Sequence, residues 1–291
     1  MDKYTIKNDE LTVSVNSFGA EISSIKDNKT NHEYIWCGDA TFWNRQSPVL
    51  FPIVGILKNK EMRYKGKVYT MGQHGFARDN EFELEKISDQ EVWFVFQSSE
   101  KTLEMYPFEF ILHIGYKLNG RKLEVLWKIE NPSDEKIYFS IGGHPAFYYP
   151  ESDSYEYMIE MDSDKDLTYG EIDVNSGCIV KGIEHTLSLN EGRFTVDENT
   201  FNNDALVFEN SNVSKVSILH SDKTPYITVE FDMPLFALWS PANKKAPFMC
   251  IEPWCGRCDY TTFDGNFEDK EYINKLNSKD EFNQKYSIIF N

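Results

Sequence analysis

The chain lacks the short motifs that hold phosphate groups, catalytic nucleophiles or catalytic zinc. Its 291 residues contain neither GxGxxG nor GxxxxGK[ST], so no dinucleotide or P-loop nucleotide site is indicated. They also contain no GxSxG nucleophile elbow and no HExxH pair, which are typical of α/β-hydrolases and zinc proteases. Their absence removes much of the usual alternative chemistry.

Basic residues and long apolar runs are also scarce. The 30 Lys and Arg residues are outnumbered by 47 Asp and Glu residues, which gives a formal net charge of −17. Such a surface repels a phosphate backbone, so we expect no nucleic-acid partner. No run approaches the roughly 18 apolar residues of a membrane span. The first residues, MDKYTIKNDELTV, lack the apolar segment of a secretory signal, so we expect a cytoplasmic protein.

Cysteine is infrequent, and the number of cysteines is odd. The five are Cys37, Cys178, Cys250, Cys255 and Cys258. An odd number without a secretory signal favours reduced thiols. The last three have the spacing C-x4-C-x2-C, but a structural zinc site usually has two ligand pairs and no second pair follows. We expect no metal site and interpret these residues as ordinary thiols.

What the sequence does contain is aromatic residues and short alternating segments. Phe, Tyr and Trp make up 15% of the chain, and aromatic residues suit a pleated sheet. Apolar and polar residues alternate in several short runs bounded by turn-forming residues, as in half-buried strands. The clearest runs are Leu11–Val15, Val92–Phe96, Leu123–Ile129 and Tyr226–Phe231.

Helical periodicity is weak by comparison. The best helix candidates are Lys270–Leu276 and a turn at Lys101–Met105, and neither separates strands in a βαβ rhythm. Asn119-Gly120 between two strand-like runs predicts a tight hairpin. We therefore expect an all-β protein with a large antiparallel β-sandwich. Because Glu151–Asp166 reads as a loop and no repeat or linker is present, residues 1–291 are predicted to form one domain.

Three segments place polar or ionisable residues among glycine, proline and aromatic residues: Gln73–Arg78 (QHGFAR), Gly142–Phe147 (GGHPAF) and Ile251–Trp254 (IEPW). In the second, two glycines would let a ligand approach the backbone, and Pro145 favours an extended conformation at His144. A histidine held in this way can donate and accept a proton near neutral pH. A purely structural histidine at a strand end is an equally good interpretation of this segment alone.

The other two segments also leave alternatives open. Glu252 has apolar neighbours that would raise its pKa by desolvation, as suits a general base, or it is a strand-edge glutamate paired with an arginine. Gly75 indicates a loop between His74 and Arg78 instead of a shared helix face. Arg78 either anchors a hydroxyl or an anionic group of a ligand, or forms a surface ion pair.

Together these segments resemble the aldose 1-epimerase (galactose mutarotase-like) superfamily, and most closely its LacX-type branch near the hexose-6-phosphate mutarotases. The combination of HGFAR, GGHPAF and CIEPW in that order is specific, whereas each part alone is weak. The resemblance spans most of the chain. It is carried by Ser47–Gly55, Tyr64–Arg78, Gly142–Phe147, Asn203–Phe208 and Leu238–Trp254.

The resemblance implies a β-supersandwich and mutarotation without a cofactor. It implies that His144 is the general acid toward the ring oxygen of a sugar and that Glu252 is the general base toward its C1 hydroxyl. It also implies that Asp204 binds sugar hydroxyls. The QHGFAR segment would contribute Gln73, His74 and Arg78 to the substrate site, and an aromatic residue such as Trp254, Phe147 or Tyr148 would stack on the sugar.

Two positions bear on which sugar is used. Ile56 stands where many relatives carry an arginine after FPIVG, which argues against ordinary galactose specificity. Arg45 lies near the place of a phosphate-contacting arginine of the hexose-6-phosphate enzymes, displaced by one residue. Three hypotheses follow: an aldohexose mutarotase, a hexose-6-phosphate mutarotase, and a non-catalytic carbohydrate-binding module. The expected partner is a small sugar or sugar phosphate, bound by a monomer or homodimer.

Overall fold

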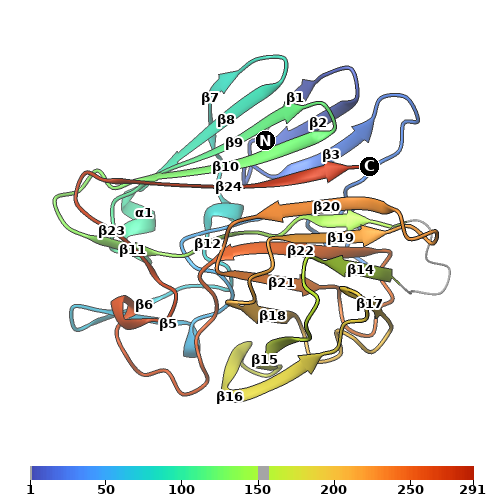
Figure 1. The fold of residues 1–291 in the computed structure, drawn as a ribbon. Helices are drawn as coiled ribbons and strands as arrows, with labels where there is room; N and C mark the ends of the chain where they lie inside the picture. The colour runs from blue at the N-terminus through green and yellow to red at the C-terminus, as the bar shows by residue number, and fades with distance from the viewer. Residues whose placement is uncertain (1, 150–156) are drawn as a thin grey trace.

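Two large antiparallel sheets dominate the computed structural model, which describes residues 2–149 and 157–291. One sheet has nine strands in the order β17-β14-β19-β20-β24-β10-β9-β8-β7, of which β7–β10 lie in the upper part of Figure 1. Its strands are β7 (Glu83–Ile87), β8 (Glu91–Gln97), β9 (Ile111–Asn119), β10 (Lys122–Glu130), β14 (Tyr157–Met161), β17 (Arg193–Val196), β19 (Lys215–Leu219), β20 (Pro225–Phe231) and β24 (Glu281–Phe290).

The second sheet has eight strands, of which β15, β16 and β18 lie in the lower part of Figure 1. Seven of them follow the order β16-β15-β18-β21-β22-β12-β4, and β13 also pairs with β22. The strands are β4 (Val49–Leu50), β12 (Ile141–Gly143), β13 (Ala146–Tyr148), β15 (Leu167–Asp173), β16 (Cys178–Leu187), β18 (Leu206–Glu209), β21 (Leu235–Trp239) and β22 (Phe248–Cys255). The predicted large antiparallel sandwich is confirmed.

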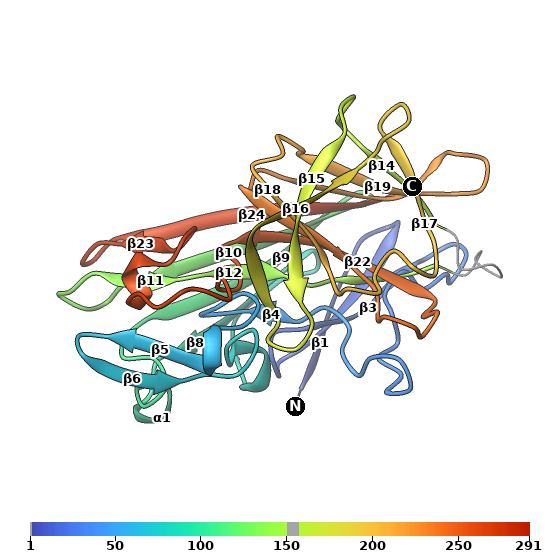
Figure 2. The same cartoon turned by 90° about the horizontal axis from the view of Figure 1, so that it is seen from below.

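Smaller elements complete the architecture. A three-stranded sheet consists of β1 (Lys3–Lys7), β2 (Leu11–Asn16) and β3 (Ile22–Asp27). The hairpin β5 (Glu61–Tyr64)–β6 (Lys67–Thr70) lies at the opposite end of the molecule from β14 and β17 in both ribbon views (Figures 1 and 2). The remaining elements are β11 (Ile137–Phe139), β23 (Asn274–Leu276), α1 (Glu100–Leu103), η1 (Lys58–Lys60), η2 (Ala77–Asp79) and η3 (Phe267–Asp269).

Strict alternation of side chains in β10 and β22 explains how the layers pack. In β10, Leu123, Val125, Trp127 and Ile129 are buried, while the residues between them are half-buried. In the second sheet, the odd-numbered Met249 and Ile251 of β22 join the same apolar core between the sheets. The even-numbered residues of β22 therefore point to the other face of the eight-stranded sheet, which is turned toward the viewer in Figure 2.

All four predicted strands are confirmed, as β2, β8, β10 and β20, and the Asn119-Gly120 turn joins β9 to β10. The turn at Lys101–Met105 corresponds to α1. The predicted helix at Lys270–Leu276 is wrong. Tyr272 has a φ of +56° that interrupts helical geometry, and β23 instead pairs with β11.

The predicted loop Glu151–Asp166 is only partly correct. Residues 150–156 lie outside the described part of the chain. Residues Tyr157–Met161 form β14 instead of a loop, because Tyr157, Ile159 and Met161 alternate into the core and the strand pairs with β17 and β19. None of the helices in the described residues has the length and apolar character that a membrane span requires.

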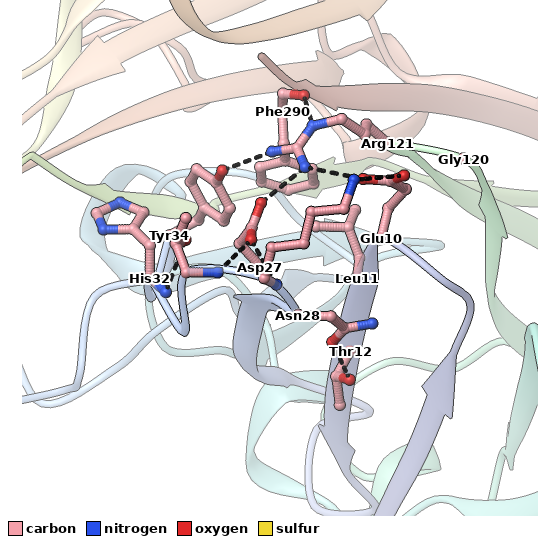
Figure 3. A network of polar contacts seen from close by, with 12 residues as sticks. Glu10, Leu11, Thr12, Asp27, Asn28, His32, Tyr34, Gly120, Arg121 and Phe290 are labelled. Atoms are coloured by element: carbon pink, nitrogen blue, oxygen red, sulfur yellow. Dashed lines mark hydrogen bonds and ion pairs between the residues drawn. The ribbon is translucent and has the colours of Figure 1, made fainter.

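One arginine, in the turn between β9 and β10, connects the three-stranded N-terminal sheet to the last strand, β24 (Figure 3). The Arg121 guanidinium donates to the Asp27 carboxylate at 2.7 Å and to the Tyr34 hydroxyl at 2.7 Å, and its Nε donates to the Phe290 carbonyl at 2.8 Å. Asp27 is nearly buried, at 6% exposed. Arg121 and the Thr30 backbone N–H hold the pKa of Asp27 well below its usual range.

Arg121→Met should lower the free energy of unfolding by about 3 kcal/mol, because it leaves a nearly buried carboxylate without its cation. Since the folded-state pKa of Asp27 is depressed, this stabilisation is complete above about pH 4 and is lost as the pH falls further. Urea unfolding at neutral and at acidic pH would measure both effects. Lys285→Met, which removes an exposed ion pair with Glu124, is the control and should cost under about 0.5 kcal/mol. Equal losses in both variants would contradict this account.

Candidate active site

The register between β22 and its neighbours brings His144 opposite Glu252. Gly142 of β12 pairs with Trp254, and Ala146 of β13 pairs with Cys250. The same register continued between these pairs puts His144 across from Glu252. On the other side of β22, Ala237 of β21 pairs with Glu252. Two segments far apart in the chain thus meet as a cross-strand pair.

The two side chains touch in a buried position. His144 Nδ1 lies 3.4 Å from Glu252 Oε1, and the residues are 7% and 1% exposed. They line a cavity of about 430 Å³, which is the size of a small-molecule site. Glu252 is not at a sheet edge, because β21 and β12 flank β22. The interpretation of Glu252 as a strand-edge residue is therefore wrong.

Burial shifts the pKa values of the pair in opposite directions. Desolvation, followed by the charge of Asp204, raises the pKa of Glu252 well above its usual value. Desolvation, followed by repulsion from Arg78, lowers the pKa of His144 to about 3. Burial therefore favours the uncharged form of both residues. Glu252 Oε2 and His144 Nδ1 are both buried without a hydrogen-bond partner.

The two glycines before His144 make room for protein side chains. A Cβ at Gly142 would lie 2.6 Å from the indole ring of Trp254, and a Cβ at Gly143 would lie 2.6 Å from the Tyr286 hydroxyl. These distances are too short for real contacts, so only glycine lets Trp254 and Tyr286 pack this closely. The glycines therefore set the position of His144 through packing.

His74 is held at the cavity by two backbone hydrogen bonds. Its N–H donates to the Gly55 carbonyl at 2.7 Å, and the Gly55 N–H donates to His74 Nδ1 at 3.0 Å. Burial lowers the pKa of His74 well below its usual value. A neutral ring whose Nδ1 accepts must carry its hydrogen on Nε2, so His74 is a donor there. Its φ of +64° is unusual for a residue other than glycine and indicates a constrained position.

Two arginines and Gln73 form a cationic side of the cavity. The Arg45 guanidinium donates to the Arg78 carbonyl at 3.3 Å and pairs with Asp79 at 2.6 Å. Arg78 Nη2 donates to the Gln73 carbonyl at 2.9 Å, but its Nε is buried without a hydrogen-bond partner. Burial and the neighbouring Arg45 lower the pKa of Arg78 to about 10. Arg78 still carries its charge at neutral pH.

Asp204 lies at the same cavity just before β18. Its φ is +77°, and its Oδ1 accepts the N–H of Ala205 at 2.8 Å. Burial raises the pKa of Asp204. The structure thus brings together all seven residues that the sequence predicted for the site: Arg45, Gln73, His74, Arg78, His144, Asp204 and Glu252.

Two tryptophans at the cavity were missed by sequence reasoning. The Trp43 ring stacks on the His144 imidazole with centroids 4.7 Å apart, and Trp239 meets it edge-on at 5.4 Å. Trp43 lies in a loop that Lys244 holds by donating to two of its carbonyls. Trp239 pairs with Cys250, which lies two residues before Glu252 in β22. Trp239 is therefore on the same face of the sheet as Glu252, and the alternation of side chains along β21 could have predicted this.

The predicted stacking residues divide into two groups. Trp254 lines the cavity, as expected. Phe147 is fully buried in the core between the sheets, because it alternates with Ala146 to the opposite face of β13. Tyr148 packs at the margin of a separate buried cluster with Phe248. These two positions are not part of the cavity lining.

The three clustered cysteines do not share a site. Cys250, Cys255 and Cys258 each belong to a different buried apolar cluster. Cys250 and Cys255 differ by an odd number of positions in one strand, so they point to opposite faces. Cys258 lines the cavity beside Gly55. The two residues pack so closely that a Cβ added to Gly55 would lie 2.6 Å from the Cβ of Cys258.

Ile56 contributes to an apolar wall near the cavity. Its side chain packs against Gly177, where an added Cβ would lie 3.1 Å from Ile56 Cγ2. Gly177, Ile172 and Val207 form the adjoining lining. The cavity thus has a cationic side at Arg45 and Arg78 and an apolar side at these residues.

Comparisons with known proteins agree with this fold. A family model described as aldose 1-epimerase matches residues 2–287. The chromosomal protein LacX of Lactococcus lactis subsp. lactis is 31% identical over 294 residues, which cover 97% of each chain. The galactose mutarotase related enzyme from Lactobacillus acidophilus is 33% identical with a TM-score of 0.93, and the match covers 100% of this chain and 97% of that one. A galactose mutarotase-like protein from Lactobacillus casei ATCC 334 is 28% identical with a TM-score of 0.91, over 100% of both chains.

Gly143→Ala should lower the free energy of unfolding by about 2 kcal/mol, because the new methyl group overlaps the Tyr286 hydroxyl. Adding Tyr286→Phe should recover part of that loss by removing the overlapping oxygen. Denaturant unfolding of the single and double variants measures both. Gly72→Ala is the control, since a Cβ there meets no atom within 4 Å. A double variant no more stable than Gly143→Ala would contradict this packing role.

Proposed function

The chain belongs to the aldose 1-epimerase family, and from this premise we propose that it interconverts the α and β anomers of an aldohexose. The observation that carries the proposal is the buried contact between His144 and Glu252 at 3.4 Å within a sugar-sized cavity. Because the proton donor and the proton acceptor are so close together, one can reach the ring oxygen while the other reaches the C1 hydroxyl, and both of these oxygens are bonded to C1 of a pyranose. No cofactor is needed for this reaction.

The chemistry requires one proton to leave the C1 hydroxyl and one to reach the ring oxygen. The C1–O5 bond then breaks and the open-chain aldehyde forms. Rotation about C1–C2 and closure with the same groups in reverse give the other anomer. Since the reaction neither consumes nor releases protons overall, the pair needs to hold one transferable proton throughout.

Because burial favours the uncharged form of both residues, we infer the following sharing of that proton. With Glu252 protonated and His144 neutral, the Glu252 proton moves from Oε1 to His144 Nδ1 as His144 Nε2 donates to the ring oxygen. Glu252 Oε2, which has no hydrogen-bond partner, accepts the proton of the C1 hydroxyl. Both residues end this step uncharged, which suits a buried pair because an isolated charge is costly there. Closure returns every proton to its starting atom.

The other cavity residues would hold and orient the sugar. His74 presents an Nε2–H donor, Asp204 presents carboxyl oxygens and Gln73 presents an amide. Trp254 and Trp239 offer apolar surfaces for the C–H face of a sugar. Trp43 covers the ring of His144 and so keeps the acid in one orientation.

A second candidate function, a hexose-6-phosphate mutarotase, is favoured by the arginine pair. Arg45 and Arg78 meet one local carboxylate, Asp79, and the buried Nε of Arg78 has no hydrogen-bond partner. An anionic group on the substrate would supply that missing acceptor. The third hypothesis, a non-catalytic carbohydrate-binding module on this fold, requires that sugars bind without faster anomer exchange.

His144→Ala and Glu252→Gln should each lower the rate of anomer interconversion at least about a hundredfold, as expected for loss of an acid–base group. Anomer-exchange NMR with glucose, galactose and their 6-phosphates would measure the rates. His185→Ala and Glu171→Gln, which alter a surface pair joined at 2.9 Å, are matched controls that should keep the wild-type rate. Near-wild-type rates in both site variants would refute the assigned roles. Sugar binding by the wild type without faster exchange would identify a binding module.

If the substrate is phosphorylated, Arg45→Met should raise KM for hexose 6-phosphates about tenfold, because a charge-assisted hydrogen bond contributes about 1.5–3 kcal/mol. KM for the free hexose should change far less. Arg63→Met, which removes an exposed arginine paired with Glu61, is the control. Parallel changes in both KM values would show that Arg45 does not select for phosphate.

A further inference from the structure

Cys250 places a thiol beside the acid–base pair, and the proposed proton transfers do not use it. One ligand atom each from His144, Cys250 and Glu252 lie within 4.8 Å of one another, and all three residues are buried. Within the described part of the chain, this is the only group of three or more histidine, cysteine or acidic side chains with such spacing.

The strand register produces this group. Cys250 and Glu252 are two positions apart in β22, so their side chains lie on the same face. Cys250 pairs with Ala146 of β13 and lies in a buried cluster with Ala246. The register therefore places the Cys250 thiol within 4.8 Å of a ligand atom of His144 and of Glu252.

Two atoms of the group lack a hydrogen bond, although His144 Nδ1 lies 3.4 Å from Glu252 Oε1. His144 Nδ1 and Glu252 Oε2 are buried, and neither makes a hydrogen bond in the described structure. Buried polar atoms of this kind usually have a partner, so they indicate a place for a ligand. The sugar would approach from the cavity, which His144 and Glu252 line. Cys250 lies behind them and is fully buried.

We propose that His144, Cys250 and Glu252 form a binding site for a thiophilic divalent cation such as Zn²⁺, and that the bound cation blocks the acid–base pair. Imidazole nitrogen, thiolate sulfur and carboxylate oxygen are the ligand types that Zn²⁺ prefers. Tetrahedral coordination at bond lengths of about 2.0–2.3 Å separates ligand atoms by roughly 3.5 Å. The His144–Glu252 separation of 3.4 Å already meets this spacing.

The charges of the proposed site balance. The cation displaces the thiol proton of Cys250 and any carboxyl proton of Glu252 to solvent, and the resulting thiolate and carboxylate neutralise its two positive charges. His144 binds as neutral imidazole. A fourth ligand, water or a sugar hydroxyl, would come from the cavity that His144 and Glu252 line. This site differs from the C-x4-C-x2-C cluster, whose other two cysteines lie in separate apolar clusters.

The binding test does not depend on activity. Cd²⁺ added to the chelator-treated protein should produce a thiolate-to-metal absorption band in the near ultraviolet, and Cys250→Ala and Cys250→Ser should each lack it. Cys255→Ala is the matched control: it removes a buried thiol of the same strand that faces the other way, and should keep the band. Circular dichroism of each variant would verify folding. A band that survives in both Cys250 variants, or no band in the wild type, would overturn the proposal.

The inhibition test rests on the proposed function and separates its failure from that of the metal site. Chelator treatment should leave the exchange rate of the wild type unchanged, and Zn²⁺ should then inhibit it in competition with sugar. Relative to each variant's own metal-free rate, Cys250→Ser should need at least about tenfold more Zn²⁺, since even an outer-shell change costs a metal site 10–100-fold in affinity. Equal Zn²⁺ sensitivity would contradict a site at Cys250. A Cd²⁺ band in a protein without exchange activity would leave the metal site standing and refute the epimerase.

Discussion

The position of the candidate site depends on the antiparallel register between β22 and the β12–β13 segment. Pairs on both sides of His144, at Gly142 and at Ala146, obey the same register, so His144 falls opposite Glu252. A slip of one residue would send Glu252 into the core between the sheets and replace it with an apolar neighbour. Two large side chains, Trp254 and Tyr286, pack against the glycines of this segment and leave little freedom for such a slip.

Burial then gives the pair its chemical character. Both residues lie in a low-dielectric environment in which neither is stable as an isolated ion, and Trp43 and Trp239 enclose the imidazole from two sides. Arg45 and Arg78 add positive charge at the same cavity while Asp204 adds acidic character beside Glu252. One face of the eight-stranded sheet thus carries the acid–base pair together with hydrogen-bond donors and acceptors that suit a ligand with many hydroxyl groups.

The sequence predicted the strands well wherever alternation was strong, as in β10, and it located the site because its residues lie in unusual local segments such as GGHPAF. It could not place Trp43, which reaches His144 through a loop held by Lys244, a contact between residues distant in the chain. The predicted helix at Lys270–Leu276 was wrong because pairing of β23 with β11 overrode a weak local pattern. The glycines before His144 were attributed to ligand approach, whereas their closest neighbours are Trp254 and Tyr286. Prediction of a single domain remains a prediction.

The location of β24 constrains the order in which the molecule can assemble. This strand, Glu281–Phe290, lies between β20 and β10 in the interior of the nine-stranded sheet. Until β24 has left the ribosome, β10 and β20 lack the strand that joins them in this sheet, and each exposes an unpaired strand edge. Nascent chains with such edges are open to wrong pairing and aggregation, so a large part of the core must wait until β24 has left the ribosome. Chaperone protection during translation would matter more for this topology than for one whose central strands come first.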